Sequence, residues 1–153
     1  MSKTIYMGSD HAGLALKELL VPGLAANGWD VEDVGTHTKE SCDYPDFAHI
    51  VCTKVLETNS FGILICGTGI GMSMAANRHA GIRAAVCTHE FHVRATREHN
   101  DANILCLGER VTAPGLALEL AKLFLATDFT GGRHQRRIEK IEPYQALSEH
   151  FTI

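Results

Sequence analysis

The sequence predicts a single α/β domain, a five-stranded parallel sheet with helices on both faces, of the flavodoxin-like or Rossmann-like three-layer type. Short apolar runs alternate with longer stretches of helical spacing along the whole chain. The runs are almost continuously apolar, which is typical of parallel strands buried on both faces. The length of 153 residues suits one domain, residues 1–153, without repeats.

The elements are expected in regular alternation from the N-terminus. An apolar run predicts a strand at 4–8, amphipathic spacing a helix at 14–26, and a second apolar run a strand at 29–34. A polar loop at 35–43 precedes a helix at 47–56 and a strand at 62–66. The same two patterns then predict, in order, a helix at 70–77, a strand at 83–87, a helix at 90–98, a strand at 103–107 and a helix at 113–127. A last helix, at about 133–149, follows Gly131-Gly132.

Composition narrows the class of protein. The net charge of −4 argues against a dedicated nucleic-acid binder. No apolar run approaches the roughly 20 residues of a membrane span, and the first residues have no signal-peptide core. The five cysteines form no CxxC pair and the nine histidines show no HExxH or HxH spacing. We therefore expect a cytoplasmic protein with reduced thiols, no metal and no other cofactor.

The segment at 62–74 carries the most information about function. An apolar run ends in Cys66, and the glycine-rich turn Gly67-Thr68-Gly69-Ile70-Gly71 opens the next helix. Alternate glycines let backbone N–H groups turn inward, and a helix N-terminus favours negative charge. Such a turn can favour a thiolate and stabilise an anion, although a buried structural cysteine before a tight turn is an equally simple interpretation.

The glycine turn suits an enediolate better than a phosphate. A Walker loop would need Gly-Lys-Ser/Thr, which is absent. A cysteine phosphatase loop would need an arginine six residues after the nucleophile, where this chain has Met72. One diffuse negative charge is matched by backbone amides and the hydroxyl of Thr68.

Other polar residues gather at element ends. In such sheets ligands bind beyond the carboxyl ends of strands, so the segments at 9–11, 66–71 and 108–110 are expected to face the site. Asp10 with His11 follows the first strand, where Asp10 could also be only a helix N-cap. His99 with Asn100 could shuttle a proton or merely end a helix, with Asn100 as the C-cap.

The last predicted helix carries two arginines on one face. Arg133 and Arg137 are four residues apart, and cations at a helix start suggest a bound anion such as phosphate. A solvated basic helix start is the alternative. Taken together with Cys66, these residues describe a site for a phosphorylated sugar.

At this point the chain resembles the type B ribose-5-phosphate isomerases of the ribose/galactose isomerase family. The matching segments run from end to end of the chain in the family's order: 8–13 (GSDHAG), 43–45 (DYP), 65–71 (ICGTGIG), 99–103 (HNDAN) and 131–134 (GGRH). The resemblance implies a flavodoxin-like, metal-free aldose–ketose isomerase. It would interconvert ribose 5-phosphate and ribulose 5-phosphate in the non-oxidative pentose phosphate pathway, through an enediolate.

The resemblance also implies roles for individual residues. Cys66 would be the base that moves a proton between C2 and C1, Thr68 and the amides of Gly67, Gly69, Ile70 and Gly71 would stabilise the enediolate, and His99 would open the sugar ring. The substrate-binding residues would be Asp10, His11, Tyr44, Asn100, Arg110, Arg133 and Arg137. Some relatives place a glutamate after the glycine turn instead; Met72 places this chain with the cysteine type.

The resemblance further implies a homodimer with shared sites, in which His99 and the C-terminal helix reach across, and sometimes a pair of dimers. Other sugar phosphates remain as substrates: allose 6-phosphate, galactose 6-phosphate or a tetrose phosphate. From other classes, a cysteine-type phosphohydrolase and a non-catalytic sugar-phosphate-binding module remain as alternatives.

Overall fold

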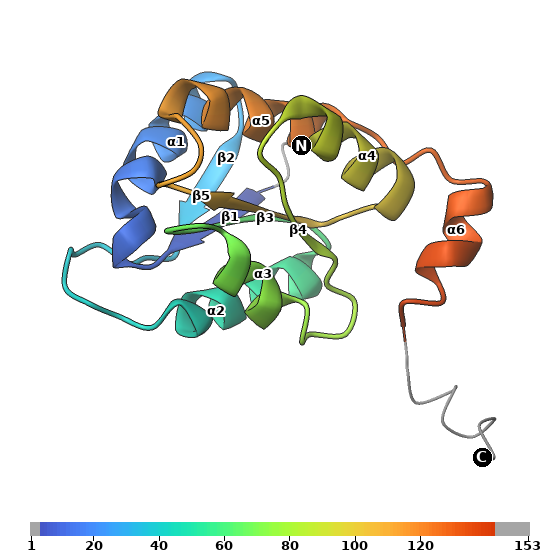
Figure 1. Cartoon of the computed structure of the whole chain (residues 1–153), viewed down its shortest axis with the longest axis horizontal. Coiled ribbons are helices and arrows are strands. Elements are labelled where there is room, and N and C mark those ends of the chain that lie inside the picture. Colours follow the sequence, from blue (N-terminus) through green and yellow to red (C-terminus); the bar gives the residue numbers. More distant parts are fainter. Residues whose placement is uncertain (1–3, 143–153) are drawn as a thin grey trace, which may run out of the picture.

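A computed structural model describes residues 4–142 of the chain (Figure 1). The strands are β1 (Thr4–Ser9), β2 (Asp30–Asp33), β3 (Phe61–Cys66), β4 (Ala84–Val86) and β5 (Ile104–Gly108). The helices are α1 (Leu14–Ala26), α2 (Tyr44–Thr58), α3 (Ile70–Ala76), α4 (Glu90–Asn100), α5 (Pro114–Ala126) and α6 (Arg133–Ile138). The predicted alternation is confirmed.

The element ends differ from prediction where local chemistry acts. α2 begins three residues earlier than expected, at Tyr44, because Pro45 suits the first turn of a helix. α4 continues to Asn100, so His99 lies inside the helix and the C-cap is Asp101, not Asn100. α6 ends at Ile138, and the part of the predicted last helix beyond residue 142 lies outside the described residues.

The five strands form one parallel sheet in the order β2-β1-β3-β5-β4. Helices α1, α4 and α5 cover one face and α2 and α3 the other, which gives the three layers in Figure 1. The chain reverses its direction of winding between β1 and β3, which is the switch point where such sheets bind ligands. Relative to the flavodoxin order 2-1-3-4-5, the last two strands exchange places.

Two apolar layers hold the sheet. One packs Leu16, Leu20 and Leu24 of α1 and Phe124 of α5 against the central strands. The other packs α2 and α3 against the opposite face and includes Met72, which is completely buried. Because the central strands are covered on both sides, they are apolar at nearly every position.

The parallel register gives the sheet two chemically different edges. Cys66 pairs with Gly108 at the carboxyl edge, and Gly62 pairs with Ile104 at the amino edge. Every loop from a strand to a helix lies at the carboxyl edge, and every connection from a helix to a strand lies at the amino edge. The four residue steps from Gly62 to Cys66 span about 13 Å.

The outer side of strand β4 is closed by a side chain. The amide of Asn77 donates to the Ala84 carbonyl and accepts from the Ala84 N–H, both at 2.9 Å. Asn77 thereby makes the pair of hydrogen bonds that a further strand would make with Ala84.

None of the helices among residues 4–142 has the length and apolar character needed to cross a membrane.

A buried ion pair joins α1 to the end of β2. The Lys17 side chain is 0 % exposed, and its ammonium donates to both carboxylate oxygens of Asp33. Asp33 also accepts a hydrogen bond from the N–H of Gly35 at 2.9 Å. The ammonium is therefore compensated inside the protein.

Separating this pair tests its role in the fold. Asp33→Asn leaves a buried ammonium without its counter-charge and is expected to lower the free energy of unfolding by about 3–5 kcal/mol. Lys17→Met places an apolar chain of similar size in the same space, while the Asp33 carboxylate keeps contact with solvent, and should cost clearly less. Urea unfolding of both variants measures the difference; equal losses would contradict this account.

Two histidines link α2 to the turn after α3. His49 Nδ1 and His79 Nε2 are 2.7 Å apart, so one ring donates a hydrogen bond to the other. Burial and the neighbouring His49 lower the pKa of His79 below its ordinary value of 6.5. The folded state therefore disfavours the charged form of His79.

This pair predicts a pH dependence of stability. Because the His79 pKa is lower in the folded chain, the unfolded chain binds more protons as the pH falls through about 6.5, and stability decreases. The variant His49→Gln with His79→Gln should lose less stability than the wild type between about pH 7.5 and 5.5. Urea unfolding at several pH values provides the measurement, and identical slopes would refute the prediction.

Candidate functional site

The loop after β3 holds Cys66 against its own glycine turn. Cys66 is 5 % exposed, and its Sγ accepts a hydrogen bond from the N–H of Gly69 at 3.1 Å. The Thr68 hydroxyl accepts from the N–H of Ile70 at 3.2 Å and is exposed. A backbone donor aimed at sulfur is favourable for negative charge at that position.

Glycine is required at two positions around this turn. Gly69 has φ +80°, in the left-handed region, and any Cβ would stand 3.1 Å from the backbone of Leu107. A Cβ on Gly108 would stand 2.6 Å from the backbone of Thr68. The turn is therefore pressed directly against the end of β5, which fixes its shape.

The segments after β1 and β5 join this loop, as predicted. The Asp10 N–H donates to the Ile65 carbonyl at 3.3 Å, and the N–H groups of Glu109 and Arg110 donate to the carbonyls of Cys66 and Gly67. The exposed Arg110 guanidinium approaches within 3.2 Å of where a Cβ of Gly67 would stand.

Asp10 and His11 both have local partners. The Asp10 carboxylate accepts from the N–H groups of Ala12 and Gly13 at 3.0 and 3.1 Å, so it is an N-cap of the short 3₁₀ turn His11–Gly13. His11 Nδ1 accepts from the N–H of Cys42 at 3.2 Å. This acceptor role leaves the proton of a neutral His11 on Nε2, which is available as a donor.

Tyr44 lies over the far end of the glycine turn. Its ring atoms lie 2.8–3.1 Å from where a Cβ on Gly71 would stand, so a side chain there would displace the ring. We call these residues at the carboxyl edge the cysteine half-site: Asp10, His11, Tyr44, residues 66–71 and Arg110.

The remaining cysteines differ in their surroundings. Burial raises the pKa of Cys52 to about 12 and that of Cys87 to about 11, and it raises that of Cys106 well above its usual value. These three remain protonated thiols at neutral pH. All five cysteines are unpaired, and within residues 4–142 no group of three or more His, Cys, Asp or Glu side chains could hold a metal ion.

His99 and Asn100 do not join the cysteine half-site within one chain. They form the last turn of α4, which leads into β5 at the amino edge of the sheet. This placement is compatible with the expectation that His99 reaches across to the site of a second chain. In a parallel sheet of this kind, a connection from a helix to the next strand lies at the amino edge. The predicted topology therefore already implied that His99 and Asn100 lie at this edge.

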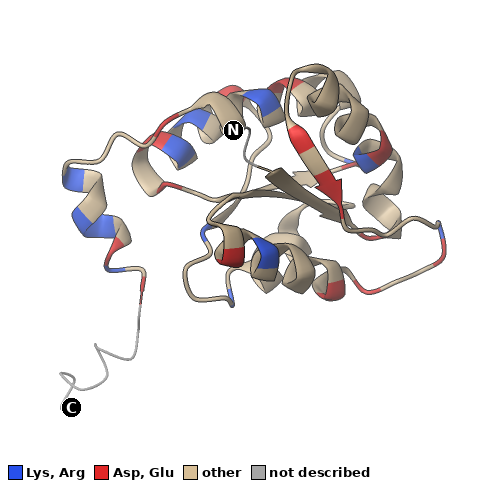
Figure 2. Cartoon of the chain, turned by 180° about the vertical axis from the view of Figure 1, so that it is seen from behind, with Lys and Arg blue, Asp and Glu red and all other residues tan. Residues whose placement is uncertain are grey.

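Helix α6 brings His134 to His99. The ring of His134 stacks on that of His99, with centroids 4.4 Å apart and planes inclined by 13°. Desolvation, His99, Arg133 and Arg137 together lower the pKa of His134. Figure 2 shows the basic residues of α6 at one end of the molecule.

We call these residues the histidine half-site: His99, Asn100, Arg133, His134 and Arg137. The sequence reasoning missed His134, although it lies in the quoted segment 131–134, because a stack between residues 35 positions apart has no local pattern. Both guanidinium-bearing residues of this half-site are exposed.

A hollow in the described part of the chain adjoins the histidine half-site. It has a volume of about 720 Å³ and lies between the end of α3, β4 and α4. Asn100 and Arg83 line it, and no residue of the cysteine half-site does. The two half-sites are therefore separated by the body of the sheet.

Comparison with known proteins gives a consistent result. The model of the family described as Ribose/Galactose Isomerase matches residues 5–141. Ribose-5-phosphate isomerase B of Escherichia coli is 45 % identical over 141 residues, which cover 91 % of this chain and 94 % of that protein.

Two solved structures share the fold closely. Ribose-5-phosphate isomerase B of Clostridium thermocellum has a TM-score of 0.90 at 48 % identity and covers 97 % of this chain and 100 % of its own. The Mycoplasma genitalium enzyme, solved with bound ribulose 5-phosphate, has a TM-score of 0.90 at 42 % identity and covers 95 % of this chain and 98 % of its own. The chain belongs to the ribose/galactose isomerase family.

Proposed function

We propose that the chain is a ribose-5-phosphate isomerase that interconverts ribose 5-phosphate and ribulose 5-phosphate through an enediolate. The observation that carries this proposal is the Cys66 thiol, which accepts a hydrogen bond from the Gly69 N–H inside the glycine turn. The E. coli and M. genitalium relatives bear the name of this activity and support the substrate.

In this mechanism Cys66 acts as a base. Its thiolate removes the C2 proton of the open-chain aldose, and the same proton, carried on sulfur, is returned to C1. The hydroxyl proton passes from O2 to O1 in the same conversion, which leaves the carbonyl on C2 and gives the ketose. The charge that appears on O1 and O2 is stabilised by the amides at 67–71 and the Thr68 hydroxyl. No covalent bond to sulfur is needed.

The histidine half-site would open the ring and hold the other end of the sugar. Ribose 5-phosphate is mostly a furanose, so a proton must move between O1 and the ring oxygen before isomerisation. His99 would carry that proton, Asn100 would contact hydroxyls, and Arg133 and Arg137 would pair with the phosphate. Asp10, His11, Tyr44 and Arg110 would line the cysteine half of the same pocket.

A complete site would then need two chains. The half-sites lie at opposite edges of one sheet, so the histidine half-site of one chain would meet the cysteine half-site of a second. A two-fold dimer makes this exchange twice and gives two identical sites. A pair of such dimers is compatible with the same arrangement.

Other substrates and classes are separable by experiment. Allose 6-phosphate, galactose 6-phosphate and tetrose phosphates would use the same chemistry, and an assay panel decides among them. A phosphohydrolase is disfavoured because Met72 is buried in the core, although Arg110 does bring a guanidinium to Gly67. Release of phosphate from a generic ester would revive that alternative, and binding of ribose 5-phosphate without conversion would support a non-catalytic module.

Five unpaired cysteines support a reducing compartment, and we propose the cytoplasm and the non-oxidative pentose phosphate pathway as the setting.

Removing the thiol tests the mechanism directly. Cys66→Ala is expected to lower kcat for ribose 5-phosphate by about 10²–10⁴ with an unchanged melting temperature, because a general base is lost while the loop persists. Cys87→Ala, which removes a buried thiol elsewhere, is the matched control and should keep kcat. Wild-type turnover by Cys66→Ala would exclude Cys66 as the base.

Mixing two inactive variants tests whether sites are shared. Cys66→Ala and His99→Ala are co-refolded, so that about half of the dimers contain one chain of each kind. Each mixed dimer has one site with both residues intact, so activity should return to about a quarter of the wild-type value.

The control mixes Cys66→Ala with Thr68→Ala, which both damage the cysteine half-site and should not restore activity beyond that of Thr68→Ala alone. A site contained within one chain would give no recovery in either mixture, and that result would rule out sharing.

A further inference from the structure

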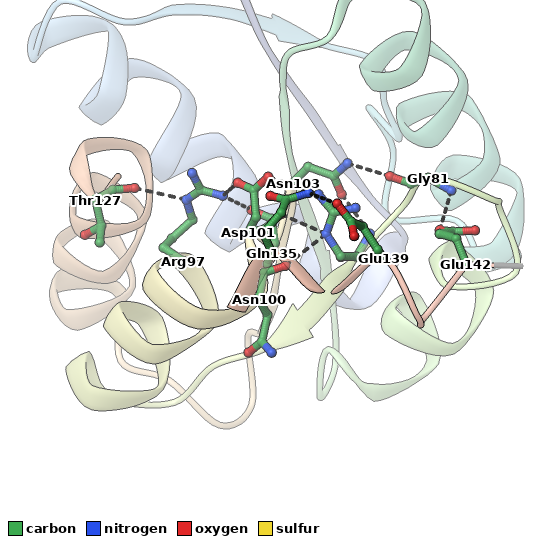
Figure 3. A network of polar contacts seen from close by, with 11 residues as sticks. Gly81, Arg97, Asn100, Asp101, Asn103, Thr127, Gln135, Glu139 and Glu142 are labelled. Carbon is green, nitrogen blue, oxygen red and sulfur yellow. Dashed lines mark hydrogen bonds and ion pairs between the residues drawn. The ribbon is translucent and has the colours of Figure 1, made fainter. Parts of the chain in front are cut away.

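Three consecutive backbone carbonyls at the end of helix α4 are held by arginines. The Asn100 and Asp101 carbonyls accept from Arg83 Nε at 2.9 and 3.1 Å, and the Ala102 carbonyl accepts from Arg97 Nη1 at 2.6 Å. The end of a helix leaves carbonyls without helical partners, and here guanidinium groups supply the donors. Figure 3 shows this network.

The carboxylate of Asp101 joins the two arginines. One oxygen accepts from Arg97 Nη1 at 2.8 Å and the other from Arg83 Nη2 at 3.2 Å. We call these three residues the Asp101 clamp. Because each arginine also holds a carbonyl of the segment 100–102, the clamp fixes both the side chain and the backbone of this segment.

Arg97 anchors the clamp to the core. It is 5 % exposed, and its guanidinium lies 4.8 Å from the ring centre of Phe61 and 5.6 Å from that of Phe124. Its Nε donates to the carbonyl of Thr127 at 3.1 Å, just after α5. A charge buried this deeply is costly without a counter-charge, and Asp101 is the carboxylate that supplies it.

Arg83 is fixed in turn by Asn103. The Asn103 side chain accepts from the Arg83 N–H and donates to the Gly81 carbonyl, both at 2.8 Å. The Gly81 N–H donates to the carboxylate of Glu142 at 2.6 Å, which ties the segment after α6 to the same network. These hydrogen bonds therefore connect the end of α4, through the clamp, to β4, β5 and the segment after α6.

The backbone conformation of Asp101 helps to explain why an aspartate occupies this position. Asp101 has φ 45°, in the left-handed region, where glycine or asparagine is the usual helix C-cap. Aspartate also tolerates this conformation, although it is a less usual C-cap than glycine or asparagine. Its carboxylate, which neither usual residue would provide, is what the two arginines require.

The clamp adjoins the histidine half-site on the chain. Asn100, whose carbonyl Arg83 holds, is itself a predicted substrate contact, and His99 precedes it. The Glu98 carbonyl accepts from the N–H of Thr130 at 3.1 Å, so the link to α6 is tied to the same helical turn. Since His134 stacks on His99, a shift of this turn would alter the ring contact as well.

We propose that Asp101, through Arg83 and Arg97, is a positioning residue that sets where His99 and Asn100 meet the sugar. This inference rests on the proposed isomerase function. Misplacement of a reacting group by about 1 Å can cost about 10² in rate, so a clamp on the backbone beside the proton-transfer residue has a direct effect on turnover.

Asp101→Asn is the decisive variant, because asparagine accepts the left-handed backbone and removes only the charge. We expect kcat for ribose 5-phosphate to fall by about 10- to 100-fold. When Asp101→Asn is co-refolded with Cys66→Ala, activity should rise, because the mixed dimer has one site with both half-sites intact. Co-refolding with His99→Ala should not raise activity, because both variants damage the histidine half-site.

Two controls separate positioning from loss of stability. Leu24→Ala opens the core far from α4, and Asn59→Gly alters the other helix end with a left-handed C-cap residue. Both should keep kcat at temperatures well below melting. An Asp101→Asn kcat equal to that of the wild type, or a loss no greater than that of Leu24→Ala at matched melting temperature, would overturn the proposal.

A spectroscopic readout does not depend on activity. The imidazole resonances of His99 and His134, assigned with single His→Asn variants, should shift in Asp101→Asn, while those of His49 and His79 stay in place. If the His99 and His134 resonances did not shift, the proposal that the clamp positions His99 would be overturned. If the wild type lacks isomerase activity, the proposed function fails. The resonances alone then decide whether the clamp fixes the position of the His99 ring.

Discussion

The parallel register of the sheet is the constraint on which the chemistry of this chain depends. It places the carboxyl end of every strand at one edge, and therefore Cys66 with its glycine turn. It places the end of α4, with His99, at the other edge. The proposed two-chain site follows from this separation, because a second copy supplies the missing half without any change in fold.

Sequence reasoning succeeded where the information is local. The alternation of apolar runs and amphipathic stretches was enough for the layers, and the loop at 66–71 could be recognised because the left-handed Gly69 and the donor to Cys66 follow from the turn itself. The Asp10 carboxylate shows the limit of such reasoning. Its N-cap bonds to Ala12 and Gly13 do not exclude a second role with a substrate.

Sequence reasoning failed where partners are distant in the chain. The stack of His134 on His99 and the contacts of Arg97 with Asp101, Phe61 and Phe124 join separate elements and leave no periodic trace. The predicted end of α4 was too early because the last turn of the helix is polar. The apolar spacing used to predict the helix therefore stops before His99. The position of His99 was recoverable from topology, since each helix-to-strand connection lies at the amino edge.

The side chain of Asn77 also limits how copies of this chain can associate. Sheets with open outer strands can extend from molecule to molecule, and such growth has no natural end point. Here the outward N–H and carbonyl of Ala84 are already occupied by one amide. Growth of the sheet from molecule to molecule through β4 is therefore blocked at Ala84, which protects a concentrated solution of the chain against fibrous aggregation along this edge.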